Sequence, residues 1–466
     1  MSVNAVALAD FGSTFTKLTV VEAGTGRRLA SAQAPTTVRT DVMEGYAEAL
    51  SRAETQLPPD TAIVEKLAAS SAGGGLRVAS VGLVADYTAA ASRQAALNAG
   101  AKVELVLAGR LTPEQIASLE AQRPEIVLFS GGTDGGQHRQ VLDNARAIAG
   151  ARFDAHVIVA CNCDVADEAA ELFVSNGHTA EVVGNVLPEI RTLDIEPARS
   201  AIHDAFIERV IRGKGLSRTE EFGRAVIMPT PEAALGATRL LAAGPPGGSG
   251  VGNVLVVDIG GATTDVHSAV TLSPHTPGIT AEGLPPLPVT RSVQGDLGMR
   301  WSALGVYEAD AAWLDEQAAA QGWPTDSAAD AAGRRRDDPD FMPADARDEA
   351  LDRLFAVSCI SHALRRHCGW LRTVYVPNQG TSFMQEGLDL REVPRVVGTG
   401  GMLVHDEAAA DTLGLALERR EEGSLVPRSA SVLLDRHYVL AAAGLLATSD
   451  AVAAYTLLVN ELGLGA

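Results

Sequence analysis

A chain of 466 residues is long for a single hydrophobic core, so we expect at least two domains, each with its own apolar interior. A content of 46% hydrophobic and 21% charged residues is typical of a soluble globular protein, and no run approaches the ~18 apolar residues of a membrane span. The formal net charge of −20 disfavours a nucleic-acid partner, because the overall field repels phosphates. Since the N-terminus also lacks a basic region followed by a long apolar segment, we predict a cytoplasmic protein.

The first motif in the chain is a predicted β-hairpin with a polar tip. A short apolar strand at residues 6–8 precedes D-F-G-S-T-F-T-K, and a second strand follows at residues 18–21. Such a tip presents backbone N–H groups and hydroxyls that can contact phosphate, although an ordinary hairpin is the alternative for this motif alone. The candidate residues of the tip are Asp10, Gly12, Ser13, Thr14, Thr16 and Lys17.

Alternating strands and helices follow the hairpin. Strands are expected at residues 102–108, 126–129, 157–160 and 181–183, and helices at residues 113–122, 135–149 and 165–175. This alternation predicts a small, doubly wound parallel sheet. The turn S-G-G-T-D-G-G, from Ser130 to Gly136, lies between a strand and a helix, so it is either an anion site that uses Asp134 or simply a tight turn.

Residues 190–223 are helical and charged in pattern, and we expect them to form a connector. A helix rich in small residues is predicted at residues 229–244, with Glu232 near its start.

The second motif, V-L-V-V-D-I-G-G-A-T-T-D, repeats the design of the first. A buried strand at residues 254–257 leads to Asp258, and a glycine-rich turn leads to Asp265 and a further strand at residues 266–270. The candidate phosphate-contacting residues are Gly260, Gly261, Thr263 and Thr264. Asp265 is either a second functional carboxylate or a cap of the turn.

The C-terminal part of the chain contains loops, helices and one further glycine motif. Residues 273–288 include five prolines and are predicted to form an ordered loop, whereas the charge-dense residues 328–348 are predicted to form a disordered surface segment. Helices are expected at residues 348–371, 407–420 and 439–447. The sequence G-T-G-G, with Gly398, Gly400 and Gly401, follows a strand at residues 395–397.

Four cysteines give no disulfide framework. Cys161 and Cys163 follow one predicted strand, and Cys359 and Cys368 lie in a predicted helix. Neither spacing matches a zinc site, so we expect buried, reduced thiols.

The two acidic glycine hairpins, the connecting helix, the G-T-G-G motif and the last small-residue helix occur in an order that resembles the actin, Hsp70 and sugar-kinase ATPase superfamily. The resemblance implies an α/β fold with duplicated actin-like (ribonuclease H-like) ATPase halves around a nucleotide cleft, and an inserted Rossmann-like α/β subdomain. It divides the chain into the first part of half I at 1–75, the insertion at 76–195, the rest of half I at 196–250, half II at 251–430 and C-terminal connecting helices at 431–466.

A narrower resemblance rests on D-F-G-S-T-F-T-K, S-S-A-G-G-G-L-R-V, L-F-S-G-G-T-D-G-G and V-D-I-G-G-A-T-T-D-V-H-S. Together these motifs look like the MutL/GlmL family of glutamate mutase accessory proteins, which is unrelated to the mismatch-repair protein of similar name. The resemblance implies an ATP-driven chaperone or reactivating factor, with the subunits of an adenosylcobalamin-dependent mutase as partners. Residues 100–116 also resemble cobalamin-binding domains but lack their D-x-H-x-x-G signature, so we expect mimicry of the mutase's cobalamin-binding subunit.

The superfamily resemblance also implies roles for the site residues, with ATP and Mg²⁺ as cofactors. Asp10 and Asp258 would hold hydrated Mg²⁺, the two glycine turns and Lys17 would contact the phosphates, and Glu232 or Asp258 would orient the attacking water. The G-T-G-G glycines would leave room for the nucleoside. A small-molecule kinase and a nucleotide-binding scaffold without hydrolysis are the alternatives, although no sugar-kinase signature is present.

Overall fold

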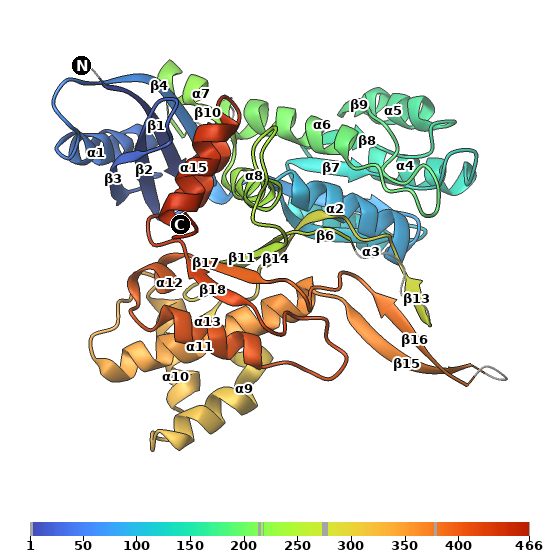
Figure 1. Cartoon of the computed structure of the whole chain (residues 1–466). Helices are drawn as coiled ribbons and strands as arrows, with labels where there is room; N and C mark the ends of the chain where they lie inside the picture. Colours follow the sequence, from blue (N-terminus) through green and yellow to red (C-terminus); the bar gives the residue numbers. More distant parts are fainter. Residues whose placement is uncertain (1–2, 213–215, 218, 273–277, 377–379, 466) are drawn as a thin grey trace. The chain divides into compact units, whose positions relative to one another are not determined.

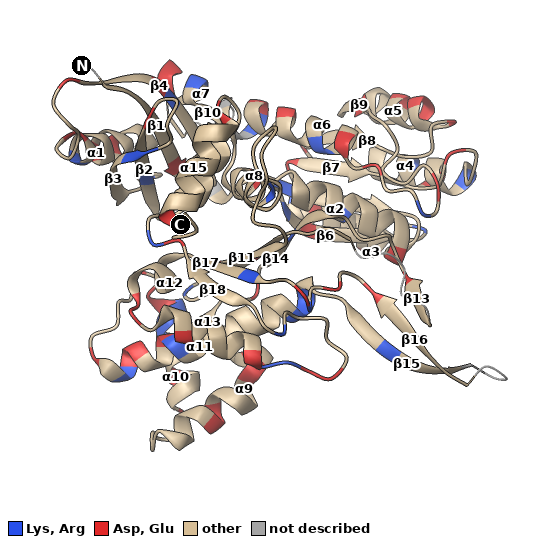
Figure 2. Ribbon diagram, viewed as in Figure 1, with Lys and Arg blue, Asp and Glu red and all other residues tan. Residues whose placement is uncertain are grey.

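A computed structural model describes residues 3–212, 216–217, 219–272, 278–376 and 380–465 (Figure 1). The chain forms two compact units: unit 1 comprises Met1–Ala237, Gly283–Pro285 and Ala441–Leu457, and unit 2 comprises Thr238–Glu282, Pro286–Leu440 and Leu458–Ala466. Among the described helices, none combines the length and the apolar character needed to cross a bilayer. Acidic and basic residues are interspersed over the helices and loops of both units (Figure 2). The domain boundaries expected from the sequence stay a prediction.

The N-terminal sheet of unit 1 has five strands in the order β10-β4-β1-β2-β3. Strands β1, β2 and β3 form an antiparallel meander, whereas β4 runs parallel to β1 and β10 runs parallel to β4. The strands are β1 (Val3–Phe11), β2 (Phe15–Glu22), β3 (Arg28–Pro35), β4 (Thr61–Ser70) and β10 (Val226–Pro229). Helix α1 (Val42–Glu54) is capped by the side chain of Asp41 and packs against β2 and β3.

The central sheet of unit 2 repeats this topology strand for strand. Its order is β14-β12-β11-β17-β18, with β11, β12 and β14 antiparallel and with β17 and β18 parallel to β11. The strands are β11 (Val254–Ile259), β12 (Thr264–Ala269), β14 (Val289–Gln294), β17 (Arg395–Thr399) and β18 (Ser431–Leu434). One strand order and one set of directions therefore occur twice, which confirms a duplicated fold and both predicted hairpins.

The last strand of each of these sheets is followed by a helix of small residues. Helix α8 (Thr230–Ala243) follows β10, and helix α14 (Val439–Leu446) follows β18. Both helices were predicted from the sequence within a few residues of their ends. A Cβ atom placed on Gly444 would lie 1.9 Å from the carbonyl oxygen of Ala233, so glycine is needed where α14 meets α8.

The predicted insertion is a five-stranded parallel sheet in the order β6-β5-β7-β8-β9. Its strands are β5 (Arg77–Gly82), β6 (Lys102–Ala108), β7 (Ile126–Phe129), β8 (His156–Val159) and β9 (Thr179–Val182), and its helices are α2 (Ala90–Asn98), α3 (Pro113–Gln122), α4 (Arg139–Ala149) and α5 (Ala166–Ser175). Fully buried Leu119, Phe129 and Phe173 lie in its core. The doubly wound sheet is thus confirmed, although its strand β5 and its helix α2 were not predicted. Helix α4 starts later than predicted, at Arg139, and Gly135, the expected first residue, has a positive φ angle of 70° that is not helical.

Other described elements connect and cover the sheets. The connector contains α6 (Glu196–Phe206), a π-helical turn at Ile207–Arg212 and α7 (Glu220–Ala225), and residues 213–215 and 218 of this prediction lie outside the described residues. Unit 2 adds α9 (Ala303–Ala320), α12 (Gly401–His405) and α13 (Ala409–Glu418), and α15 (Ala451–Glu461) lies near the C-terminus. Short turns of helix lie at Ala72–Gly74 and Ala85–Ala89.

Two predictions of loop and helix length were wrong. In the segment predicted as a loop, residues 273–277 lie outside the described residues, but residues 279–282 form strand β13 (Ile279–Glu282). This strand joins β16 (Gly380–Glu386) and β15 (Trp370–Val376) in a three-stranded sheet. The helix expected to reach residue 371 ends at His367, because β15 begins at Trp370 and pairs with β16.

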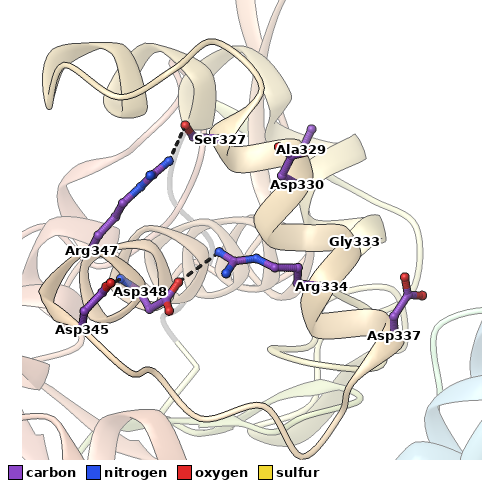
Figure 3. A pocket seen from close by; sticks show the side chains of 9 residues that line it. All are labelled: Ser327, Ala329, Asp330, Gly333, Arg334, Asp337, Asp345, Arg347 and Asp348. Carbon is purple, nitrogen blue, oxygen red and sulfur yellow. Dashed lines mark hydrogen bonds and ion pairs between the residues drawn. The ribbon is translucent and has the colours of Figure 1, made fainter.

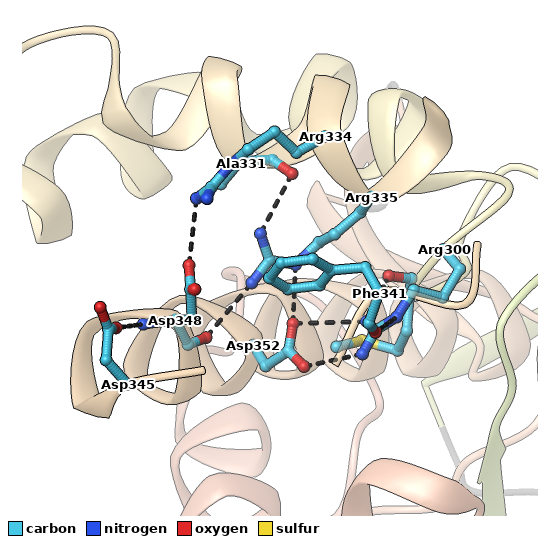
Figure 4. A network of polar contacts seen from close by, with 9 residues as sticks. Arg300, Ala331, Arg334, Arg335, Phe341, Asp345, Asp348 and Asp352 are labelled. Atoms are coloured by element: carbon cyan, nitrogen blue, oxygen red, sulfur yellow. Dashed lines mark hydrogen bonds and ion pairs between the residues drawn. The ribbon is translucent and has the colours of Figure 1, made fainter. Parts of the chain in front are cut away.

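The prediction of disorder for residues 328–348 was also wrong. The segment contains α10 (Ser327–Asp337) and the start of α11 (Ala346–His367), and the side chain of Arg335 is fully buried. Its charges are satisfied internally: Arg335 Nε donates to Asp352 at 2.7 Å, and its other nitrogens donate to the backbone carbonyls of Ala331 and Asp348 (Figure 4). A dense pattern of charges usually indicates a segment that is exposed to water, but here arginines of α10 pair with aspartates of α11.

All four cysteines are free thiols. Cys161, Cys359 and Cys368 are buried, as predicted, and burial raises the pKa of the Cys161 and Cys359 thiols to about 12. Cys163 is exposed, so the prediction was wrong there, because it lies in the loop that follows β8.

Candidate functional site

The turn between β11 and β12 in unit 2 accepts hydrogen bonds from the segment Met299–Ser302, which lies just before α9. The N–H of Met299 donates to the carbonyl oxygen of Gly260 at 3.0 Å, and the N–H of Arg300 donates to that of Gly261 at 2.7 Å. The hydroxyl of Ser302 donates to the carbonyl of Ala262 at 2.7 Å. Three successive carbonyl groups of the turn therefore point towards the segment just before α9.

This arrangement fixes the direction of the N–H groups on the other side of the turn. In a trans peptide the carbonyl of one residue and the N–H of the next point in opposite directions, and the described residues contain no cis peptide bond. The N–H groups of Gly261, Ala262 and Thr263 therefore point away from the supporting segment. None of the three donates to an acceptor within the described part of the chain. Three such groups in a row form a concavity that suits an anion.

Two aspartates flank this turn and have different environments. Asp258 and Asp265 face each other across the β11–β12 ladder. A carboxylate oxygen of Asp265 accepts a hydrogen bond from Arg291 Nε at 2.7 Å, and the other accepts one from the Thr263 hydroxyl at 3.1 Å. These contacts favour the capping role for Asp265. Asp258 is half-buried at the end of β11, and together with burial its charge raises the pKa of Tyr438.

The two threonines of the turn also differ. Thr264 is fully buried, and its hydroxyl donates to the carbonyl of Leu297 at 2.8 Å, so this predicted binding residue has its polar group engaged inside unit 2. Thr263 is half-buried beside the row of N–H groups.

The first turn, in unit 1, closes in the same way. The N–H of Gly12 donates to the carbonyl of Phe15 at 3.2 Å, and in unit 2 the N–H of Gly260 donates to Thr263 at 2.9 Å. A Cβ atom on Gly12 would lie 2.7 Å from the Phe15 oxygen, so the tight turn requires glycine. Ser13 and Thr14, at the tip, are exposed.

Asp10 lies at the end of β1 beside this turn, with 8% of its surface exposed. The hydroxyl of Thr230, the first residue of α8, donates to one carboxylate oxygen at 2.6 Å, and Lys17 Nζ lies 3.6 Å from the other. Asp10 and Lys17 are thus together, as predicted. Sequence reasoning missed Thr230, although its place directly after a strand of the same sheet was a usable signal.

The equivalent position in unit 2 is occupied by Asp435, which sequence reasoning also missed. Asp435 follows β18 as Thr230 follows β10, and only 1% of its surface is exposed. Its carboxylate accepts hydrogen bonds from the N–H groups of Val439 and Leu440, at 2.8 and 3.2 Å, and so caps α14. The Thr399 hydroxyl donates to it at 3.4 Å.

Glu232 lies in the first turn of α8 and is held by α6. Arg199 donates to one carboxylate oxygen at 2.6 Å, and His203 Nδ1 lies 2.8 Å from the other. The hydrogen bond from Glu232 raises the pKa of His203. Both oxygens of Glu232 are therefore engaged by cationic or protonatable groups.

The G-T-G-G glycines fall into two groups. Cβ atoms on Gly398 and Gly400 would lie 2.8 Å from the Leu403 side chain and 2.2 Å from the Ile259 carbonyl oxygen. These two glycines allow close packing within unit 2. Gly401, at the start of α12, is exposed and has open space around it.

The turn from Ser130 to Gly136 is braced by its own aspartate. Asp134 accepts hydrogen bonds from the Asn185 side chain at 2.8 Å and from the Cys163 N–H at 3.0 Å. Partial burial acts to raise the pKa of Asp134, but these hydrogen bonds outweigh it and the pKa falls. The contacts favour the geometric interpretation of the turn.

The described residues contain no group of three or more His, Cys, Asp or Glu side chains that could hold a metal ion. Magnesium, however, usually binds proteins through one or two carboxylates and keeps several waters. Asp10 fits such an ion, because it is a carboxylate near the end of a strand, beside the exposed tip of the first turn and in contact with the Thr230 hydroxyl.

A pocket of about 600 Å³ lies elsewhere, between α10 and the start of α11 (Figure 3). Arg334 and Arg347 line it together with several aspartates, and Arg334 pairs with Asp348 at 3.0 Å. None of the predicted site residues lines this pocket.

Comparisons with solved structures give distant similarities across the chain. A nucleotide-free acetone carboxylase is 12% identical, with 96% of this chain and 70% of that chain covered and a TM-score of 0.36. A glycerol dehydratase reactivase is 11% identical, with coverage of 95% and 99% and a TM-score of 0.34. Xylulose kinase from Bifidobacterium adolescentis is 14% identical, with coverage of 98% and 93% and a TM-score of 0.31.

The sequence comparisons are much closer. The family model described as MutL protein matches residues 6–462. The protein named Protein MutL from Clostridium tetanomorphum is 37% identical over 449 residues, which cover 95% of this chain and 96% of that protein. On this evidence, the chain belongs to the MutL/GlmL family, as its sequence motifs predicted.

Proposed function

We propose that this protein binds ATP with Mg²⁺, hydrolyses it, and uses the reaction to reactivate an adenosylcobalamin-dependent mutase of the glutamate mutase type. The observation that carries the nucleotide part is the row of three N–H groups at Gly261, Ala262 and Thr263, which is a concavity for phosphate oxygens beside an aspartate at a strand end. The mutase part rests on the family resemblance.

Each unit has a set of groups suited to phosphate and metal. In unit 2, the row of N–H groups would hold phosphate oxygens, and Asp258 would hold a water of the magnesium shell. In unit 1, Lys17 would add positive charge, and Asp10 would hold hydrated Mg²⁺ with the help of Thr230. The ion would neutralise the negative charge of the phosphates. Phosphoryl transfer to water mainly needs this charge neutralisation and the correct positioning of the phosphate and the water.

Because both carboxylate oxygens of Glu232 are already in hydrogen bonds, we propose that Asp258 is the residue that orients the attacking water. Arg199 and His203 already take both oxygens of Glu232, so that residue is better suited to fixing the start of α8, whose first residue contacts Asp10. Similarly, Gly401 is the G-T-G-G residue with space for a nucleoside.

The inserted sheet is proposed to contact the mutase. The strand order of this sheet is β6-β5-β7-β8-β9, or 2-1-3-4-5 when its strands are numbered along the chain, which is the order of flavodoxin-like domains. This order supports mimicry of a cobalamin-binding subunit. Hydrogen exchange on the native protein with and without the mutase tests this proposal. We expect slower exchange within residues 76–195, and a complex that leaves this range unaffected would contradict mimicry.

ATPase activity with and without the mutase tests the proposed function. We expect mutase-stimulated hydrolysis that falls by about 100-fold or more in Asp10→Ala and Asp258→Ala, since each removes a group that holds the metal. Ser13→Ala, at the exposed tip, is the milder comparison. Phosphorylation of a small metabolite without any protein partner would instead establish a kinase, and binding of ATP without hydrolysis would establish a scaffold.

A further inference from the structure

The segment that supports the second turn is itself anchored by buried charges. Arg300, whose N–H donates to Gly261, directs its guanidinium to Asp352 on α11, with Nη1 and Nη2 at 3.3 and 2.9 Å from the two carboxylate oxygens. Arg335 on α10 donates to the same carboxylate at 2.7 Å. Figure 4 shows both guanidinium groups pointing at this one carboxylate, with the ring of Phe341 beside them.

These groups are removed from solvent to different degrees. The side chains of Arg335, Asp352 and Arg300 are 0%, 5% and 15% exposed. The Phe341 ring adds to the cluster, since the Arg335 and Arg300 guanidiniums lie 5.0 and 5.8 Å from its centroid and the Phe341 carbonyl accepts from Arg300 Nε at 3.0 Å.

A buried ion cluster is weak evidence for stability, because desolvation offsets most of the attraction between the charges. What this cluster does fix is the position of Arg300. If Arg300 moves, the hydrogen bond to Gly261 is lost, and the peptide group that joins Gly261 to Ala262 loses the contact that fixes its direction. The N–H of Ala262 would then no longer be held towards the phosphate side, because carbonyl and N–H turn together.

We infer that Arg300, Asp352 and Arg335 are positioning residues for the phosphate-binding turn Gly260–Thr263. The charge-dense helix α10 and the start of α11 therefore serve the nucleotide site without contacting the nucleotide. This inference rests on the proposed function, and it adds residues that neither the glycine motifs nor the family resemblance indicated.

Binding of MgATP and of adenosine by the full-length protein tests the inference. Asp352→Asn removes the shared charge without changing the side-chain volume, so we expect MgATP affinity to fall by about tenfold while adenosine affinity stays within twofold. A purely structural role would lower both affinities. Arg336→Ala is the matched control, because Arg336 lies next to Arg335 on α10, is 47% exposed and pairs with Asp337, and it should leave both affinities unchanged.

The outcomes separate the two proposals. If the native protein does not bind MgATP, the proposed function is contradicted. If the native protein binds MgATP and Asp352→Asn binds it as tightly, only the positioning role is contradicted. Should Asp352→Asn fail to fold, hydrogen exchange on the native protein decides. The amides of Met299 and Arg300 should then exchange more slowly when MgATP is added, and unchanged exchange would contradict the inference.

Discussion

At the scale of single residues, two residues of the same type within one motif can differ in burial and in hydrogen-bond partners. The two adjacent threonines of the second turn illustrate this, since Thr264 bonds to Leu297 in the core and Thr263 bonds to Asp265 near the surface. The glycines of G-T-G-G differ likewise, because a side chain on Gly400 would collide with Ile259 and one on Gly401 would meet nothing. A motif identifies the location of a site, but burial decides which of its members are available to a ligand.

The G-T-G-G glycines give a paired prediction for stability. Gly400 has a φ of 97° and no room for a Cβ atom, so Gly400→Ala should lower the free energy of unfolding by about 2 kcal/mol or more. Gly401→Ala, one residue later in an exposed helical position, should be neutral or slightly stabilising. Denaturant unfolding of both variants checks this, and equal losses would contradict the packing role of Gly400.

His203 gives a prediction on pH dependence. Its pKa is raised by the hydrogen bond to Glu232, so its contribution to stability is fully present below the ordinary histidine pKa of about 6.5 and is lost as pH rises through the folded value. His203→Gln should therefore destabilise the protein more at pH 6 than at pH 9. Chemical denaturation at both pH values measures the difference, and a pH-independent difference would show that the Glu232 contact does not favour protonation.

At the scale of elements, much of the fold was predictable and some of it was not. Periodic patterns predicted the strands and helices of the insertion from β6 onwards, both hairpins and helices α8 and α14, because an apolar pattern of the right period leaves few alternatives. Strand β5 and helix α2 were not predicted. The helix α10 was missed, since its charges are neutralised by residues distant in sequence, such as Asp352 for Arg335. Thr230 and Asp435 were missed for a related reason: only strand pairing brings these ends of β10 and β18 beside the turns.

Packing of α11 against the central sheet of unit 2 should be sensitive to acid. His367, near the end of α11, bonds to Ser268 on β12 and Ser292 on β14, and burial lowers its pKa to about 4. The unfolded chain takes up this proton near pH 6.5, so stability should decline as pH falls from about 6.5 towards 4. The decline should be smaller in His367→Gln, as measured by thermal unfolding across this range. An unchanged decline would assign the acid sensitivity to other groups.

At the scale of the whole molecule, the same sheet topology occurs in both units, with a glycine turn after the first strand of each. Duplication gave each unit an aspartate at the end of that strand, Asp10 and Asp258, yet the residues around them have diverged. Lys17 lies opposite Asp10, whereas Asp265 lies opposite Asp258 and is neutralised by Arg291. Lys17 beside the first turn and the row of unpaired N–H groups in the second turn are therefore two different groups, each of which suits phosphate.

Calorimetric titration of the native protein with MgATP tests the central claim most directly. We predict saturable binding, weakened by about tenfold or more in both Lys17→Ala and Asp258→Ala, because each substitution removes a group that is proposed to contact the phosphates or the hydrated metal ion. Absence of binding by the folded native protein, or binding that neither substitution weakens, would contradict the account.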